Sequence, residues 1–230
     1  MNTSQVIKNI RLLSLVLFLT PFFSGCEALD ELDRETRERN LRNLKDWNVN
    51  SSTSEEAISE FGYENCFKIV AVEDYWWNEF SSYYRGDQSA VKRNDYSSVR
   101  TLFYCKNAMD HIHVGEIICN KSIANDLLTI FRQLYEAKYD IDTLMPTLAT
   151  DYIILTEDAS PSYNHTFCFH FMADPVDEMH LKGLALVVNP YAPSQPTADD
   201  LCVKLFKQHG FTWGGDVQGG KRYRFESSRR

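Results

Sequence analysis

The sequence predicts a single α+β domain with a small central antiparallel sheet flanked by helices. Residues 122–139 carry apolar side chains at helical spacing, whereas residues 101–105 and 111–119 are short runs typical of strands. With 230 residues, of which 43% are hydrophobic, the chain can bury one good core and carry extra segments. No internal repeat is visible, so we expect residues 55–230 to fold as one unit.

The N-terminal segment, residues 1–25, is predicted to be a targeting signal outside the fold. A basic start is followed by an apolar run, residues 12–23, that is too short to span a bilayer comfortably. Two small residues then lead to Cys26, and this order resembles a bacterial lipoprotein signal. The resemblance implies a lipid on Cys26, insertion in a lipid bilayer, and a place in the bacterial cell envelope, either periplasmic or surface-exposed. An ordinary secretory signal or membrane anchor is the alternative, since Phe23 stands where leucine is more usual.

Residues 26–54 are predicted to form a charged tether between the signal and the domain. The stretch is dense in charge, and its leucines are too sparse to build a core: Leu29, Leu32, Leu41 and Leu44. A capping-box pattern, Ser52 with Glu55 or Thr53 with Glu56, then opens a helix. We therefore place the start of the domain at residue 55.

Three further segments complete the predicted domain. Residues 167–171 form a short apolar strand, and residues 223–226 form a closing strand. A second helix, residues 198–209, begins at a Thr197 cap and ends at Gly210.

An aromatic cluster lies in the first part of the domain: Tyr75, Trp76, Trp77, Phe80, Tyr83 and Tyr84. Such side chains can stack on sugar rings, but they also bury large areas, and we favour core packing.

His111 and His113 alternate along one predicted strand, so their side chains share a face and could bind one metal ion. Because no third ligand lies near them in sequence, surface histidines are the preferred interpretation.

The charge and the cysteine spacing argue against two further kinds of protein, nucleic-acid binders and zinc ribbons. The formal charge of −8 argues against a nucleic-acid surface, which needs clustered cations. Five cysteines follow Cys26, none spaced as in a zinc ribbon: Cys66, Cys105, Cys119, Cys168 and Cys202. An exported chain permits disulfides, but we expect most of these side chains to be small buried hydrophobes.

Several motifs in the second half of the chain carry a family resemblance. They are His180-x-x-Gly183-x-Ala185 with Asn189-Pro190, Asp200-Leu201-Cys202, Gly210-Phe211-Thr212-Trp213-Gly214-Gly215, the run from Val114 to Lys121, and residues 164–172. Together they resemble the D-alanyl-D-alanine carboxypeptidase and L-alanyl-D-glutamate endopeptidase family of zinc peptidases, over roughly residues 60–226. The resemblance implies a small α+β domain that holds zinc in a cleft.

The chemistry of such a site requires particular groups. Three protein ligands hold the zinc, which lowers the pKa of a bound water to about 7 and polarises the scissile carbonyl. A carboxylate accepts the proton of that water, and a cation or hydrogen-bond donor stabilises the oxyanion.

Of the family's three zinc ligands and one catalytic carboxylate, this chain has only one residue of the required type. The first zinc ligand falls on His180, but the second, an aspartate, is Val187 here, and the third, a histidine, is Arg224. The catalytic carboxylate falls on Lys221, or on Arg222 if a residue has been lost. A zinc ion about 4 Å from a guanidinium would be repelled by roughly 8 kcal/mol at an effective dielectric near 20.

The substrate-binding positions are changed as well. The family's arginine falls on Met172, its asparagine on His170, and a polar turn residue on Phe167. The residues that would line the cleft are Phe167, His170, Met172, His180, Val187, Asn189, Trp213 and Arg224.

The resemblance therefore implies a degenerate zinc peptidase with no intact metal site, no catalytic residue and no cofactor. We expect a non-catalytic binding or interaction module of the cell wall, with a peptidoglycan stem peptide or an envelope protein as partner. One alternative is an active peptidase with zinc re-sited around His180, recruiting carboxylates or the histidine close to it in sequence: His170, Asp174, Asp177 and Glu178. Another is a structural envelope lipoprotein whose cleft is filled by apolar side chains.

Two of these residues also have simpler explanations. His180 could be satisfied by a single hydrogen bond beside a strand, which we favour over metal ligation. Trp213 is better explained as a core tryptophan on a tight turn whose glycines adopt positive φ.

Overall fold

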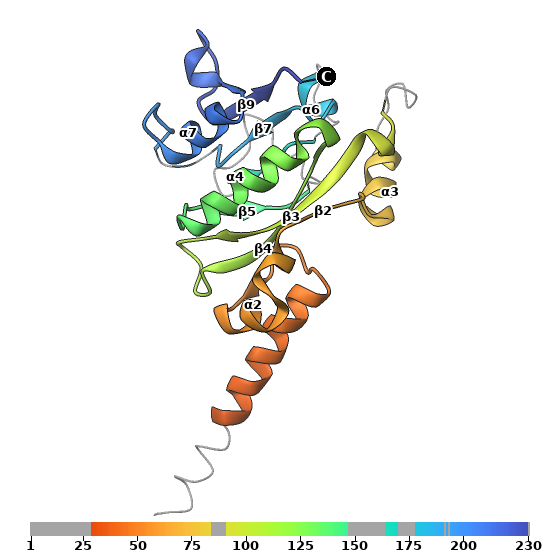
Figure 1. Cartoon of the computed structure of the whole chain (residues 1–230), viewed down its shortest axis with the longest axis vertical. Helices are drawn as coiled ribbons and strands as arrows, with labels where there is room; N and C mark the ends of the chain where they lie inside the picture. Colours follow the sequence, from red (N-terminus) through yellow and green to blue (C-terminus); the bar gives the residue numbers. More distant parts are fainter. Residues whose placement is uncertain are drawn as a thin grey trace, which may run out of the picture.

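The computed structural model describes residues 29–83, 91–146, 164–169, 178–190, 192 and 194–229. Within these ranges helices pack on antiparallel sheets, which confirms the predicted α+β class (Figure 1). The predicted signal and the lipidation residue Cys26 lie outside the described residues, as do His170, Met172, Asp174 and Asp177. No helix within the described ranges combines the length and apolar character needed to cross a membrane.

The largest sheet has four antiparallel strands in the order β1-β4-β3-β2. Its strands are β1 (Ser52–Thr53), β2 (Lys68–Val70), β3 (Tyr96–Tyr104) and β4 (Ile112–Asn120). The long β3–β4 hairpin runs in register from Tyr96 opposite Asn120 to Tyr104 opposite Ile112. Both strands predicted here are present, and the first extends further toward the N-terminus than expected, because the polar Ser97 and Ser98 are buried within it.

One face of this sheet is covered by α4 (Ala124–Glu136), the helix predicted most clearly by spacing. Its predicted apolar face is buried against β3 and β4: Ile123, Leu127, Ile130, Phe131 and Leu134. The helix begins two residues later than predicted, because Asn120 caps a preceding 3₁₀ turn (Lys121–Ile123) by accepting from the backbone N–H of Ser122. In Figure 1, α4 lies between the main sheet and the C-terminal elements.

The opposite face is covered by N-terminal residues, and here the predicted domain boundary is wrong. Residues 29–45 form a helix whose final turns enter the core: Leu44 is 0% exposed and Trp47 is 7% exposed. These side chains pack with Leu102 and Val114 of the main sheet. The chain then adds β1 to the edge of β4. The folded unit thus begins well before residue 55, because a few apolar side chains suffice once the sheet offers them a surface.

The first part of the same helix behaves as the predicted tether does. Leu29 is 67% exposed and Leu32 is 59% exposed. In Figure 1 this end of the helix projects away from the rest of the chain.

Two short helices complete that side. α2 (Glu55–Phe61) begins where predicted, but its N-cap is Ser54, which accepts from the N–H of Ala57 at 3.3 Å, rather than Ser52 or Thr53. Those two residues form β1 instead.

The aromatic residues from Tyr75 to Phe80 lie on α3 (Asp74–Tyr83), and two of them serve the core, as predicted, whereas Tyr84 lies outside the described residues. Trp76 and Phe80 are buried against Tyr96, Ile118 and Phe169. Tyr75 is exposed.

The C-terminal third forms a second antiparallel sheet, in the order β7-β9-β8. Its strands are β7 (Ala185–Val187), β8 (Phe211–Trp213) and β9 (Arg224–Ser227), the last being the predicted closing strand shifted by one residue. α7 (Leu201–Gln208) packs beside β8. Its N-cap is Asp200, which accepts from the N–H of Cys202 at 2.8 Å, so the predicted Thr197 cap is wrong. Gly210 follows the helix at a φ of 81°, as expected for its end.

A two-stranded parallel sheet connects the two larger ones. It pairs β5 (Thr143–Leu144) with β6 (His165–Thr166). Phe167 then bridges Val187 of β7, and the N–H of Phe169 bonds the carbonyl of Ile118 in β4 at 3.1 Å. The single central sheet expected from the sequence is therefore three small sheets joined by these bridges.

Gly183 shows why the chain needs glycine at one of these junctions. Its φ is 64°, and a Cβ there would lie 2.7 Å from the backbone nitrogen of Asn120. The Asn120 N–H instead donates to the Gly183 carbonyl at 2.9 Å. The absence of a side chain thus lets the end of β4 approach the turn before β7.

All five cysteines after Cys26 are free and buried. Burial raises the pKa of each thiol above its ordinary value, to about 11 for Cys66. Their prediction as small buried side chains is confirmed.

Candidate functional site

The structure brings four of the predicted site residues into one corner. His180 lies on α6 (Glu178–Leu181), and its ring centroid is 5.1 Å from that of Phe167. Phe167 and Val187 exchange backbone hydrogen bonds of 3.0 and 2.9 Å. Val187 lies directly opposite Arg224 in the β7–β9 ladder. A chain of pairwise contacts thus links His180, through Phe167 and Val187, to Arg224.

His180 is 5% exposed, and its Nδ1 lies 2.6 Å from the carbonyl oxygen of Cys168. Since a carbonyl only accepts, Nδ1 carries a proton in this contact. This agrees with the simpler explanation that one hydrogen bond satisfies the ring. Metal-bound histidines are oriented by the same kind of bond, so the neighbours of His180 must distinguish the two roles.

Those neighbours do not fit a zinc ion. Val187 is buried and has no donor atom. The Nε of Arg224 pairs with the Glu226 carboxylate at 2.6 Å. The pKa of Lys221 is lowered, first by partial loss of solvent and second by the Arg224 guanidinium. At the positions that the resemblance aligns with two ligands and a base, this chain therefore has two cations and an aliphatic side chain.

The alternative of a zinc ion re-sited around His180 gains no ligand from Glu178, the candidate that lies within the described residues. Glu178 begins α6, and its carboxylate is paired with Lys182 at 2.9 Å. This pair lowers the pKa of Glu178, which is fully solvated.

Asn189 has a structural role that its place in the Asn-Pro motif did not indicate. Its φ is 44°, a region that asparagine tolerates better than most residues. Its Nδ2 donates to the carbonyl of Asp140 at 2.7 Å, and its Oδ1 accepts from the N–H of Asp142 at 3.3 Å. The side chain therefore clamps the backbone of residues 140–142.

Trp213 is a core residue, as preferred from the sequence, but the reason given for its glycines is wrong. It is 5% exposed, and its Nε1 donates to the carbonyl of Arg222 at 2.5 Å. Positive φ does not occur at Gly214 or Gly215. A Cβ on Gly214 would lie 2.0 Å from the carbonyl oxygen of Lys221, so close backbone approach is what requires glycine there.

His111 and His113 do not meet as a ligand pair. The ring of His111 stacks on Tyr104 with centroids 5.2 Å apart, and that of His113 stacks on Phe103 at 5.3 Å. Phe103 and Tyr104 are successive residues of β3 and point to opposite faces of the sheet. Each imidazole instead contacts a backbone carbonyl, of Cys105 and of Asn50 respectively. The preferred non-metal interpretation therefore fits the geometry.

A second constellation was not anticipated from the sequence. Cys105, Asp140 and Asp142 each place one ligand atom within 4.8 Å of the others. The N–H of Ile141 bonds the carbonyl of Tyr104 at 2.9 Å, which sets residues 140–142 beside the end of β3. Because side chains alternate along extended backbone, Asp140 and Asp142 share the face toward Cys105.

Each carboxylate in this group is oriented by one donor. Asp140 Oδ1 accepts from the backbone N–H of Lys106 at 2.7 Å, and Asp142 Oδ2 accepts from the side-chain amide of Asn164 at 2.6 Å. Burial raises the pKa of the Cys105 thiol and the two carboxylates add to this, while the backbone amides of residues 107 and 108 oppose it.

A cavity of about 230 Å³ adjoins the group. Its walls include Asp140, Asn189, Asp200, Tyr139 and Cys202. Burial raises the pKa of Tyr139, with further contributions from Cys202 and Asp200.

The same cavity is also lined by Val188 and Phe225, the neighbours of Val187 and Arg224 along β7 and β9. Since alternate residues of a strand face opposite sides, this hollow lies across the sheet from Val187 and Arg224.

A larger hollow, of about 500 Å³, opens below the β3–β4 turn. Aromatic side chains dominate part of its wall: Tyr63, Tyr104, His111 and Tyr135. The sequence did not indicate it, since these residues come from four separate segments.

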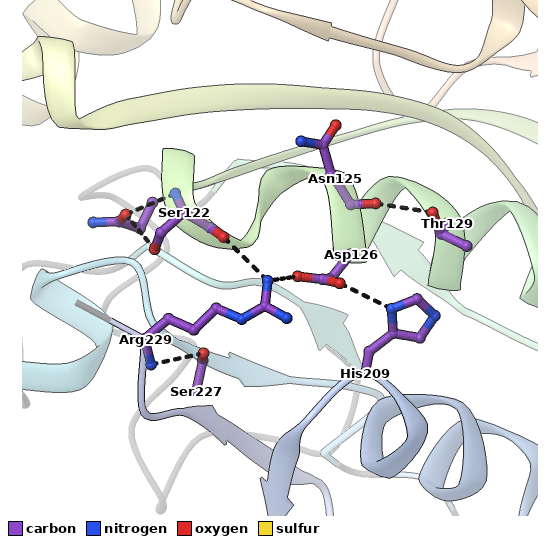
Figure 2. A network of polar contacts seen from close by, with 8 residues as sticks. Ser122, Asn125, Asp126, Thr129, His209, Ser227 and Arg229 are labelled. Carbon is purple, nitrogen blue, oxygen red and sulfur yellow. Dashed lines mark hydrogen bonds and ion pairs between the residues drawn. The ribbon is translucent and has the colours of Figure 1, made fainter.

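A polar network ties the first turn of α4 to the C-terminus (Figure 2). The Asp126 carboxylate contacts Nδ1 of His209 at 2.9 Å and the guanidinium of Arg229. The same guanidinium donates to the carbonyl of Ser122, and the backbone N–H of Arg229 donates to Ser227 Oγ at 3.2 Å. His209 ends α7, so this network fixes α7 and the C-terminal segment to α4.

One sequence signal could have pointed to the second constellation. Aspartates two apart, at 140 and 142, share a face whenever the backbone is extended. Their association with Cys105 depends on a bridge between distant segments, which no local pattern reports. No protein-family model matches this chain, and no curated protein or solved structure does so either.

Proposed function

We propose that the chain is an exported lipoprotein, anchored through Cys26 in the bacterial cell envelope, whose domain resembles a cell-wall zinc peptidase but acts as a non-catalytic binding or interaction module. Its partner would be a peptidoglycan stem peptide or another envelope protein.

The corner around His180 carries this proposal. His180 contacts Phe167, Phe167 bridges Val187, and Val187 lies opposite Arg224, yet of these four residues only His180 has a donor atom suited to zinc. A metal held by one imidazole beside a guanidinium gains too little coordination to offset the repulsion between the two cations. Without that metal, and with lysine at the position of the base, none of these four described residues activates water for attack on a peptide.

The retained framework supports a binding role rather than a random loss of function. The glycine at 183, the asparagine clamp at 189 and the buried Trp213 are all used by the fold. Arg224 and Lys221 place positive charge near this corner, which suits the carboxylates of a stem peptide.

The test measures hydrolysis and binding of a stem peptide ending in D-alanyl-D-alanine, using wild-type protein and the His180→Ala variant. We expect no turnover by either protein, with or without a chelator. Hydrolysis that disappears both with chelator and with His180→Ala would refute the non-catalytic role.

A structural lipoprotein with a filled cleft is the second candidate, favoured by the burial of Phe167 and Val187. Isothermal titration with the same peptide separates the two. Heat of binding that is lost in Arg224→Ala, but kept in the matched control Arg222→Ala, supports the module. Absence of binding to the peptide and to an envelope extract favours the structural candidate.

A further inference from the structure

We infer that Cys105, Asp140 and Asp142 form a binding site for a borderline divalent cation of the zinc class, separate from the corner around His180. The inference goes beyond the proposed function and does not depend on it.

The three groups are turned toward one another as acceptors. Their sulfur and oxygen atoms lie within 4.8 Å of one another. Each carboxylate accepts one hydrogen bond, from the Lys106 N–H and from the Asn164 amide respectively. Neither carboxylate pairs with a lysine, arginine or histidine of the described residues. Two half-buried anions without a cation repel each other, and a bound metal ion would remove that repulsion.

The sulfur is an independent indication of a ligand. Cys105 is 8% exposed, so its side chain is more than nine-tenths buried, and it points at the two carboxylates. Within the described chain no acceptor takes the thiol proton. A buried sulfur that faces two carboxylates is therefore placed to act as a ligand together with them.

The surrounding structure holds the ligands in place. Asn189 fixes the backbone at both aspartates through its amide, with a bond of 2.7 Å to the Asp140 carbonyl. The bridge from Tyr104 to Asp140 fixes the segment against the end of β3. Asn164 fixes the orientation of the Asp142 carboxylate at 2.6 Å. These contacts are the outer layer that orients the ligands of metal sites.

The ligand set selects the class of metal. Calcium and magnesium prefer oxygen ligands alone, whereas zinc accepts a mixture of sulfur and carboxylate oxygen. Zinc bonds of roughly 2.0–2.3 Å require the three atoms to close in on a common centre, which small side-chain rotations allow. The cavity of about 230 Å³ beside Asp140 leaves room for water as a fourth ligand.

Cobalt(II) is the probe, because a thiolate bound to cobalt gives a charge-transfer absorption that carboxylates alone do not. The full chain is titrated with cobalt in detergent under reducing conditions, and zinc is then added to displace it. We expect one cobalt per chain with the thiolate band, and loss of that band on adding zinc. The band should disappear in Cys105→Ser and in Asp142→Asn. Asn164→Ala should weaken binding by about 10–100-fold, the usual effect of removing an outer hydrogen bond.

Cys66→Ser is the matched control, since Cys66 is also fully buried but lies in another cluster. It should keep the band, as should His180→Ala, which separates this site from the peptidase-like corner. Circular dichroism establishes whether each variant is folded. If Cys105→Ser does not fold, Asp142→Asn still tests the site. Absence of the band in folded wild-type protein, or an equal band in Cys105→Ser, would overturn the inference.

Discussion

Val187 lies directly opposite Arg224 in the antiparallel pair of β7 and β9. Cross-strand neighbours have Cβ atoms about 4.5–5.5 Å apart, close enough to share one metal ion. Both positions fall on zinc ligands in the peptidase family that the chain resembles, and His180 reaches the same corner through Phe167. At the three positions that this resemblance aligns with zinc ligands, the chain carries one histidine, one valine and one arginine.

Restoring two side chains should therefore restore a zinc site. In a Cys105→Ser background, which removes the other metal site, we expect Val187→Asp with Arg224→His to retain one zinc per chain after dialysis. The measurement is zinc content by atomic emission. Adding His180→Ala should abolish the retained zinc, and retention without His180 would show that the corner does not have the inferred geometry.

The end of the N-terminal helix should contribute to stability. Leu44→Ala removes a fully buried side chain and is expected to lower the free energy of unfolding by about 2–5 kcal/mol. Leu32→Ala is the matched control on the same helix, where the side chain is 59% exposed, and should change it by no more than about 0.5 kcal/mol. Urea unfolding measures both. Equal effects would mean that residues 29–54 are a uniform tether.

The network in Figure 2 should stabilise the C-terminal part of the fold. Asp126→Ala leaves His209 and Arg229 without their shared acceptor and is expected to cost about 1–3 kcal/mol in unfolding free energy. Asp199→Ala is the control, because its side chain is 97% exposed and its pair with Lys204 is weak at 3.5 Å. Hydrogen exchange should show faster opening of α7 in Asp126→Ala alone.

Glu116 should make the stability depend on pH. Burial raises its folded-state pKa above the ordinary 4.5, although Ser98 and Arg100 oppose the shift. The unfolded chain therefore releases this proton at lower pH than the native protein does. The contribution of Glu116 is fully present below pH 4.5 and is lost as pH rises through the folded-state pKa. In Glu116→Gln the decline of unfolding free energy with pH in this window should be smaller. Unfolding curves recorded across that range test it, and an unchanged slope would exclude the raised pKa.

Lipid attachment is expected to depend on Cys26. Cys26→Ser should block labelling by radioactive palmitate in cells and move the protein to the aqueous phase of a detergent partition. Cys66→Ser, a buried thiol, is the control that should leave both unchanged. Labelling that persists in Cys26→Ser would place the lipid elsewhere.

Local patterns predicted the longest regular elements. The spacing of Leu127, Ile130 and Leu134 predicted α4, and the runs around residues 101–105 and 111–119 predicted β4 and the second half of β3. The strand predicted at residues 167–171 is wrong in its described part, where β6 is His165–Thr166 and Phe167 forms a single bridge. Such patterns succeed because periodic burial leaves a periodic sequence. They failed at the caps of α2 and α7, where several serines, threonines and aspartates compete and only the final backbone path selects one.

The burial of Leu44 and Trp47 could not be predicted from the local sequence either. Two apolar side chains in a charged stretch are typical of a tether. In the folded chain they are buried because they pack against the sheet at Leu102 and Val114. Whether a sparse apolar pattern is core or surface depends on what packs against it, and that partner is distant in sequence.

By itself the sequence predicted α4, most of α7 and the two long strands β3 and β4, and it gave the chemical reason why one histidine alone cannot hold zinc. Only the tertiary structure decided that His180, Val187 and Arg224 share a corner and that Cys105 faces Asp140 and Asp142. The physical reason is that composition and spacing act along the chain, whereas a site is made by contacts between segments far apart. Here those contacts are single bridges, from Phe167 to Val187 and from Tyr104 to Asp140.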